Sequence, residues 1–122
     1  MFVACFLLPR KGQISTGISK TGCEGNCENG FGKWTYTDNT TYEGNWVDTK
    51  KHGQGTETWP NGYIYKGEFK NSIWSGIGTL KFPDGSTYEG QWVNGFMNGE
   101  GTFTWSDGKQ KTGTWINGKL QE

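Results

Sequence analysis

The sequence has no excess of charge of either sign. It holds 12 Lys and Arg residues against 12 Asp and Glu residues, which leaves a formal net charge of zero. These residues are scattered along the chain. Proteins that hold nucleic acid present a basic patch or stripe to the phosphate backbone. The sequence has no such stripe, so we do not expect nucleic acid as a partner.

Hydrophobic residues are also few. They make up 31% of the 122 residues, whereas glycine alone contributes 21. Such a chain forms one domain at most and lacks the residues for a thick two-layer core. The apolar run at residues 1–8 is far shorter than a bilayer span, and no basic leader precedes it. We interpret residues 1–22 as an N-terminal tail, either disordered or loosely docked, or as a truncated export signal. Residues 23–122 form the predicted repeat domain.

Histidine and cysteine are scarce. His52 is the only histidine, and we interpret it as a solvated residue and not as a general base. A structural zinc site needs four Cys or His ligands, and Cys5 and His52 are isolated from Cys23 and Cys27. We therefore expect no metal. Cys23 and Cys27 form a disulfide if the protein is exported, or remain thiols if it is cytosolic. The cytoplasm is favoured, and export stays open if the true start lies upstream of Met1.

What the sequence does have is glycine at a fixed period of 23 residues. A period that holds over four units without insertion is the signature of a stack in which each unit packs only against its neighbours. Three series follow it, namely Gly30, Gly53, Gly76 and Gly99; Gly32, Gly55, Gly78 and Gly101; and Gly44, Gly67, Gly90 and Gly113. The predicted repeats cover about residues 30–52, 53–75, 76–98 and 99–122.

Aromatic residues keep the same period, so architecture explains most of them before any ligand is invoked. One column contains Tyr36, Trp59, Phe82 and Trp105; a second contains Tyr42, Tyr65 and Tyr88; a third contains Trp46, Phe69, Trp92 and Trp115.

The third copy shows that the unit is a β-hairpin. Two β-favouring runs, 76–82 and 86–93, flank the turn tripeptide Pro83-Asp84-Gly85, which is typical of a type I turn closed by a bulge. In this register Leu80 faces Tyr88, Gly78 faces Gly90 and Gly76 faces Trp92. One face is then aromatic and the other mostly polar, which a slip of one residue would destroy. We expect Gly90 to leave room for the ring of Trp92 on bare backbone.

Two segments of the chain, 42–62 and 88–108, resemble the MORN repeat. They contain its pattern of Tyr-Glu-Gly-x-Trp/Phe, then Asn-Gly, Gly-x-Gly and a turn of the Pro-Asp-Gly kind. The resemblance implies an all-β, single-layer array of consecutive antiparallel β-hairpins with no long helix. We expect eight strands in four hairpins. It also implies a role in binding or scaffolding, through self-association, partner proteins or membrane attachment.

Three copies depart from the pattern, and the second has Lys66 where Glu43 and Glu89 stand. The first copy turns at Asp38-Asn39 without Pro or Gly, which is tolerable because Asn visits the left-handed region. In the last copy Lys111-Thr112 replaces Tyr-Glu, which is typical of a capping repeat with a more polar end.

No catalytic group emerges. The repeated acids lie in columns set by turn and strand geometry, and each Gly-x-Gly begins a strand where a phosphate loop would open a helix. We therefore expect no enzyme activity and no cofactor.

Two surfaces are candidate binding sites. The linkers after the hairpins present Ile73-Trp74 and Phe96-Met97, which either form an apolar interaction edge or fold over the rim of the aromatic face and complete its packing. The aromatic face itself is the second candidate, because a single layer has nothing of its own to cover it. Its candidate residues are Trp46, Tyr65, Tyr88 and Trp92.

Three functions follow from these surfaces. We favour a protein-binding or self-associating scaffold. A membrane-surface module is an alternative, but the basic pairs Arg10-Lys11 and Lys50-Lys51 predict only weak or no binding to anionic lipid. A glycan-binding module that stacks sugars on exposed aromatic rings is the third.

Overall fold

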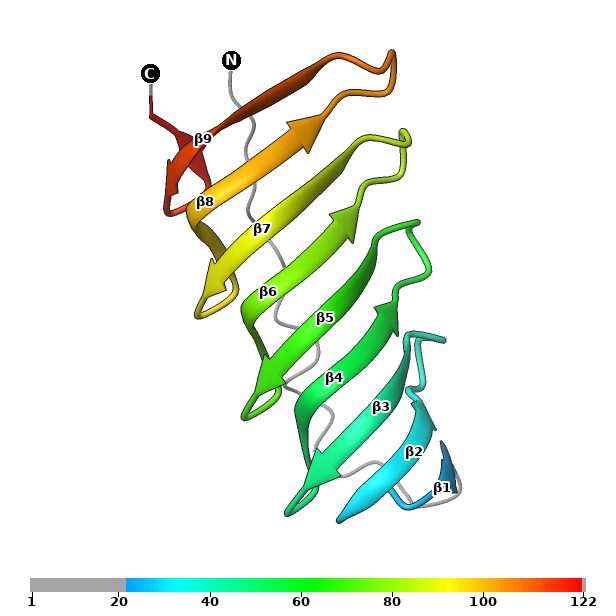
Figure 1. Cartoon of the computed structure of the whole chain (residues 1–122). Helices are drawn as coiled ribbons and strands as arrows, with labels where there is room; N and C mark the ends of the chain where they lie inside the picture. Colours follow the sequence, from blue (N-terminus) through cyan, green and yellow to red (C-terminus); the bar gives the residue numbers. More distant parts are fainter. Residues whose placement is uncertain (1–21, 122) are drawn as a thin grey trace.

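The computed structural model describes residues 22–121, which form one open antiparallel sheet without an α-helix (Figure 1). The ten strands lie in the sheet in chain order, so each strand pairs only with its neighbours in sequence. They are β1 (Cys23–Gly25), β2 (Gly30–Thr35), β3 (Thr41–Val47), β4 (Lys50–Thr58), β5 (Ile64–Lys70), β6 (Ile73–Lys81), β7 (Thr87–Val93), β8 (Phe96–Thr104), β9 (Gln110–Ile116) and β10 (Lys119–Leu120).

The predicted all-β, single-layer hairpin array is confirmed, but the expected number of strands is too small. The two additional strands, β1 and β10, are the short strands at the two edges of the sheet. The interpretations of residues 1–8, Cys5 and Arg10-Lys11 fall on residues outside the described part of the chain.

The hairpin turns have the predicted register. In the third repeat Gly76 pairs with Trp92, Gly78 with Gly90 and Leu80 with Tyr88. The turn closes with a hydrogen bond of 2.9 Å from the Gly85 amide to the Phe82 carbonyl, and Gly85 has a φ of 94°. In the first repeat Asn39 takes the same left-handed position, with a φ of 76°.

The connections between repeats are tight turns of two residues, and not linkers. Both residues of each connection have positive φ, which is the type I′ geometry that matches the twist of paired strands. They are Asp48-Thr49, Asn71-Ser72, Asn94-Gly95 and Asn117-Gly118. Residues such as Ile73 and Phe96 therefore begin strands, so their side chains alternate between the two faces of the sheet.

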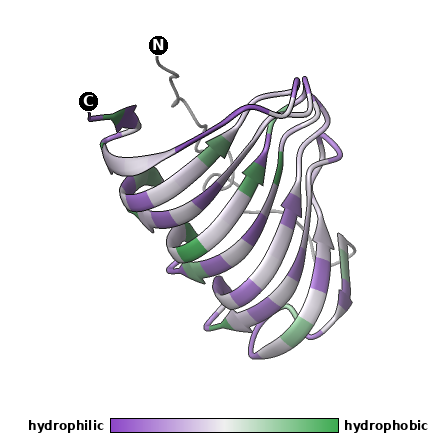
Figure 2. Ribbon diagram, turned by 45° about the horizontal axis from the view of Figure 1, so that its top comes forward, coloured by the Kyte–Doolittle hydropathy of each residue, from purple (hydrophilic) through white to green (hydrophobic). Residues whose placement is uncertain are grey.

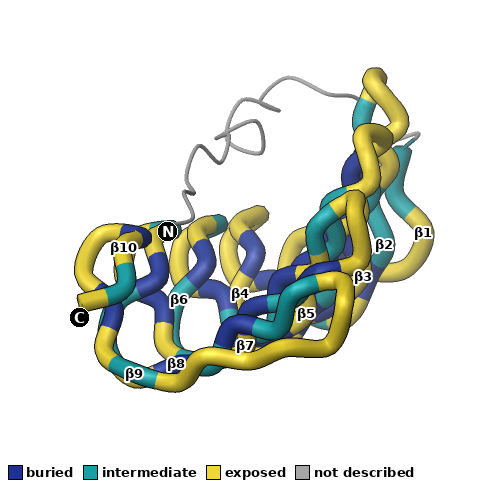
Figure 3. The backbone as a smooth tube through the Cα atoms, turned by 90° about the horizontal axis from the view of Figure 1, so that it is seen from above, coloured by how far each residue is buried: buried dark blue, intermediate teal, exposed yellow. Residues whose placement is uncertain are grey.

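A bulge bends the sheet between each hairpin and the next, at three places. In the pairs β3–β4, β5–β6 and β7–β8 the register shifts next to a Gly-x-Gly, whose first glycine has positive φ. The carbonyl of the residue opposite the bulge accepts a hydrogen bond from a tyrosine hydroxyl, for example from Tyr42 to Asn45 at 2.8 Å. Bulges of this kind bend strands and increase their twist. The sheet is accordingly curved, with its buried residues toward the inner side (Figure 3).

The core is the ring-packed inner face of this curve. The ring of Tyr65 stacks on that of Trp74 at a centroid distance of 4.5 Å and meets Trp92 edge-on at 5.5 Å. Trp, Tyr and Gly score near the middle of the hydropathy scale, so the ribbon shows few strongly hydrophobic bands although the face is buried (Figure 2). Aromatic pairs across neighbouring repeats thus hold the stack together.

The glycine columns make room for the tyrosine rings. A Cβ atom on Gly90 would meet the hydroxyl of Tyr88 and the backbone of Gly101. Trp92 instead donates its indole N–H to the carbonyl of Gly78 at 3.0 Å. The hydroxyl end of Tyr88 thus lies beside Gly90, and the indole of Trp92 reaches the backbone of Gly78, the strand partner of Gly90. That Gly90 itself leaves room for the ring of Trp92 stays a prediction.

Candidate functional site

The four candidates on the aromatic face are core residues. Trp46, Tyr65, Tyr88 and Trp92 are each at most 5% exposed. The curved sheet and the neighbouring rings cover this face, which sequence reasoning expected to stay open. Burial also raises the pKa of Tyr88 to about 12, and burial together with nearby carboxylates raises the pKa values of Tyr42 and Tyr65 further. A sugar or a partner therefore finds no open ring at these four residues.

Because of the two-residue turns between repeats, two of the other four candidates are buried and two are exposed. Trp74 and Met97 point inward and complete the packing of the core, which is the second alternative weighed for them. Ile73 and Phe96 point outward and are 39% and 44% exposed. The alternation follows from the two-residue turns, because the first strand residue after each turn lies on the outer face.

The outward residues form what we call the linker strip. It consists of the cross-strand pair that flanks each turn between repeats, and its members are all exposed. Every member is either a large apolar residue or a lysine, and none is acidic. The four pairs are Val47 with Lys50, Lys70 with Ile73, Val93 with Phe96, and Ile116 with Lys119.

The apolar members of two successive turns approach each other at Gly95, the turn residue before Phe96. Val93 and Phe96 are paired directly. Ile73 belongs to the preceding turn, and its Cγ2 atom would lie 3.7 Å from a Cβ atom on Gly95. The apolar part of the strip therefore passes from one repeat to the next. Its sequence signal is the fixed period, which puts a residue of these two kinds at both positions in all four repeats.

Sequence reasoning missed a buried ion pair in the second repeat. The Nζ atom of Lys51 lies 2.7 Å from Oε2 of Glu57, and both side chains are almost completely buried. The indole N–H of Trp74 donates to the other carboxylate oxygen of Glu57 at 2.8 Å. Lys51 Nζ also lies 5.0 Å from the ring centroid of Tyr36, within the range of a cation–π interaction.

Because of this ion pair, Lys51 does not contribute to an exposed basic surface. Burial is the largest single effect and would lower the pKa of Lys51, but the charge and hydrogen bonding of Glu57 together with those of Tyr36 raise it overall. The reading of Lys50-Lys51 as an exposed basic pair is therefore wrong for Lys51. The periodicity contains the signal, because Lys51 stands in the column of Trp74 and Met97, which is otherwise apolar.

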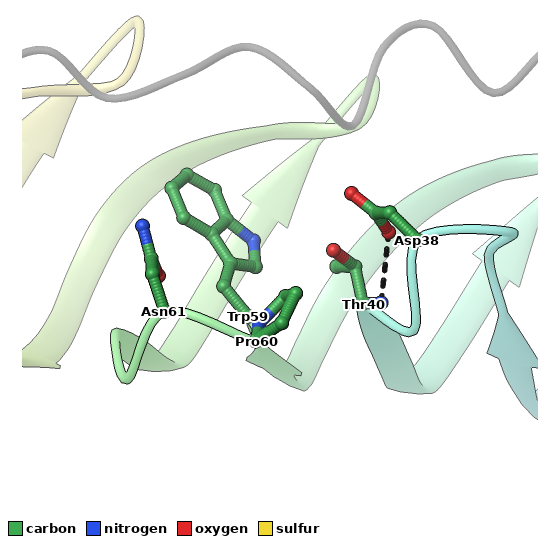
Figure 4. Close-up of a pocket in the computed structure, with 5 residues that line it drawn as sticks. All are labelled: Asp38, Thr40, Trp59, Pro60 and Asn61. Carbon is green, nitrogen blue, oxygen red and sulfur yellow. Dashed lines mark hydrogen bonds between the residues drawn. The ribbon is translucent and has the colours of Figure 1, made fainter.

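The space between the first two hairpin turns is a shallow pocket of about 320 Å³, which we call the turn pocket (Figure 4). Asp38 and Thr40 lie on one side of it, and Trp59, Pro60 and Asn61 on the other. The amide of Thr40 donates to Oδ1 of Asp38 at 2.9 Å, which fixes the carboxylate at the mouth of the pocket. Neither Thr40 nor Asp38 was singled out as a binding residue from the sequence.

The remaining chemical groups offer no further centre. Cys23 and Cys27 are joined in a disulfide, so the structure selects one of the two alternatives for this pair. His52 lies exposed on β4. Within residues 22–121 no three His, Cys, Asp or Glu side chains are grouped to hold a metal ion, and no helix could cross a membrane.

The comparison with known families agrees with the geometry. The family model of the MORN repeat matches four consecutive segments, residues 28–41, 42–62, 65–87 and 88–110. No curated protein matches the chain. MORN repeats are modules for interaction with proteins or membranes. Because the four matched segments run consecutively from β2 through β8 and cover more than half of the chain, the chain belongs to the MORN repeat family.

Proposed function

We propose that this protein is a non-enzymatic scaffold that binds a protein partner or a second copy of itself through the linker strip. The observation that carries the proposal is the exposed apolar pair of Val93 and Phe96, which Ile73 extends into the preceding repeat. Contiguous exposed apolar surface on a soluble protein is typical of an interaction site. The strip is also rigid, because its members are strand residues next to tight turns.

Phe96 is the anchor that we expect to matter most. Interface hot spots are enriched in large side chains, and truncating one costs about 2 kcal/mol or more of binding energy. That corresponds to a loss of affinity of about thirtyfold. Trp74, in contrast, is now expected to act on stability, because it is buried between Tyr65 and Trp92.

The test compares Phe96→Ser with the matched control Phe31→Ser. Phe31 is also an exposed phenylalanine, at 61%, but it is not a member of the linker strip, and its strand β2 is distant in the strand order from the Val93–Phe96 pair of β7 and β8. Sedimentation velocity over a range of concentrations measures self-association, and a photo-crosslinking residue at position 93, the strand partner of Phe96, captures a different partner. We expect Phe96→Ser to abolish the association or the crosslink-dependent complex while the melting temperature stays unchanged. Equal behaviour of the two variants would contradict the proposal.

An anionic membrane surface is the second candidate partner. It is favoured by Lys50, Lys70 and Lys119, which alternate with the apolar members of the linker strip. Each basic residue near an anionic surface contributes about 1 kcal/mol, so these few lysines predict weak binding that added salt removes. Cosedimentation with phosphatidylserine vesicles at low and high salt measures it. Strong binding that survives high salt would show that the apolar residues insert into the bilayer.

A further inference from the structure

The turns between repeats form a regular row along one side of the sheet (Figure 1). In each of the last three turns the second residue donates its backbone amide to a carbonyl of the preceding repeat. These hydrogen bonds run from Ser72 to Lys51 at 2.9 Å, from Gly95 to Trp74 at 3.0 Å and from Gly118 to Met97 at 2.9 Å. Neighbouring strands lie about 4.8 Å apart, so turns that are two strands apart recur at roughly 10 Å. The linker strip is therefore a row of rigid residue pairs with a fixed spacing.

This spacing matches that of an α-helix with a heptad pattern. Seven helical residues rise about 10.5 Å, and the two apolar positions of each heptad, a and d, lie on one face. Each repeat likewise presents two strip residues, one on either side of its turn. A helix that lies across the strands therefore sets one heptad against each repeat. Residues on one face of an extended strand recur at about 6.6 and 13 Å, which does not match.

The side chains of the strip indicate which kind of helix fits. From the second to the fourth turn the strip has an apolar middle and a lysine at each end. The middle consists of Ile73, Val93, Phe96 and Ile116, and the ends are Lys70 and Lys119. Two intervals between turns span roughly 20 Å, which is the length of about two heptads. The matching helix has an apolar face with acidic residues near both ends of it.

The acidic side chains around the strip limit where this helix lies. Asp48 is the one acidic member of the eight turn residues, and it belongs to the first turn. Glu68 and Glu100 lie on strands β5 and β8, farther from the turns than the strip. The carboxylate of Glu100 also accepts a hydrogen bond of 2.8 Å from the hydroxyl of Thr114. An acidic helix therefore fits over the second to fourth turns, on the turn side of both glutamates.

We propose that the linker strip binds an acidic amphipathic helix of a partner protein across its second to fourth turns. This partner follows only if the linker strip is the binding surface proposed above. Residues 22–121 contain no α-helix that a second copy could offer. Two strips placed face to face would also have lysines as their only charged members, and like charges across an interface disfavour association. The helix therefore belongs to a different protein.

The test is a titration of the nitrogen-labelled chain with three synthetic peptides, followed by NMR. Each peptide has about 21 residues, or three heptads. The acidic peptide has Leu at positions a and d and Glu beside them; the basic peptide has Lys in place of Glu; the permuted peptide has the acidic composition without the apolar face. We expect the acidic peptide to shift the amide signals of residues 70–74, 93–97 and 116–119 and to gain helix in circular dichroism. The other two should bind at least about tenfold more weakly, because one loses the charge match and the other the apolar face.

Two variants separate the apolar and the charged contribution. We expect Phe96→Ser to weaken binding of the acidic peptide about thirtyfold, as for an interface hot spot. Lys70→Gln should weaken it about threefold, since an exposed ion pair contributes little. The matched controls are Phe31→Ser and Lys81→Gln, which change exposed residues outside the strip. Both controls should bind the acidic peptide as the unchanged chain does, and all four variants should keep the melting temperature.

The outcomes distinguish this partner from the scaffold function itself. Equal binding of the acidic peptide and either of the other two, or shifts confined to residues outside the strip, would overturn the acidic helix. If no peptide binds while Phe96→Ser still abolishes self-association or the crosslink from position 93, the scaffold function stands and the acidic helix is wrong. If phosphatidylserine vesicles shift the strip signals and the acidic peptide does not, the partner is a membrane and the acidic helix is again wrong.

Discussion

The buried ion pair allows a sharp test of what holds the second repeat together. Lys51→Met places in this column the residue that Met97 provides two repeats later, so the side-chain volume is nearly kept. Glu57 would then stay buried, with the indole N–H of Trp74 as its remaining side-chain donor. Removing one partner of a buried pair typically costs about 3–5 kcal/mol. We expect Lys51→Met to lose that much of the free energy of unfolding.

Replacing both partners should cost far less. In Lys51→Met/Glu57→Leu both columns become apolar, as in the later repeats, and such replacements are often neutral or stabilising by about 1–4 kcal/mol. The indole N–H of Trp74 loses its acceptor, however, at a cost of about 1–3 kcal/mol. The two effects nearly cancel. Lys51→Met/Glu57→Gln keeps an acceptor for Trp74, and we expect it to be at least as stable as the Leu variant.

Urea unfolding followed by tryptophan fluorescence measures these free energies. The control is Lys50→Met, an exposed neighbour on the same strand, which should change stability by less than about 0.5 kcal/mol. If Lys51→Met were as stable as Lys50→Met, or if the Lys51→Met/Glu57→Leu variant lost the sum of the losses measured for Lys51→Met and for Glu57→Leu alone, the ion pair would not be a coupled buried unit.

Three further predictions concern the core, the disulfide and the turns. The free energy of unfolding should fall above about pH 10, by up to roughly 4 kcal/mol per pH unit for Tyr42, Tyr65 and Tyr88 together. These tyrosines ionise in the unfolded chain, whereas their raised pKa values keep them protonated in the folded chain. Equal urea midpoints at neutral and strongly alkaline pH would refute this. Reducing the Cys23–Cys27 disulfide should cost about 2 kcal/mol and loosen β1, which hydrogen exchange of the β2 amides measures, and unchanged protection would argue against it. Gly78→Ala should destabilise the protein more than Gly85→Ala. A Cβ atom at Gly78 would overlap the Tyr65 ring, whereas a Cβ atom at Gly85 meets no other atom and is disfavoured only by the positive φ of that residue. Melting temperatures in the opposite order would show that the Tyr65 ring can move.

Much of this fold could be predicted because its information is local and periodic. The register of the third hairpin followed from Leu80, Tyr88 and the turn between them, and the structure has that register. The curvature could not be predicted. It depends on bulges beside the Gly-x-Gly segments, and the pattern alone does not distinguish a bulged strand from a regular one.

The candidate site was harder to predict for a related reason. Ile73-Trp74 and Phe96-Met97 were assigned to linkers, and without the two-residue turns the alternation that buries Trp74 and exposes Ile73 cannot be followed. Charge was also misleading, because Lys51 belongs to a core column despite its ammonium group. The turn pocket depends on how two turns lie relative to each other, which no single repeat specifies.

The strict chain order of the strands also determines how the molecule carries mechanical load. A force applied between the two ends of the sheet passes through every strand pair in series, so the weakest pair limits the whole. The weakest strand pairs are at the two ends of the sheet, where β10 pairs with β9 through two residue pairs and β1 pairs with β2 through three. The array therefore yields from its ends inward. Its middle repeats, where Tyr65, Trp74 and Trp92 interlock, are the last to separate.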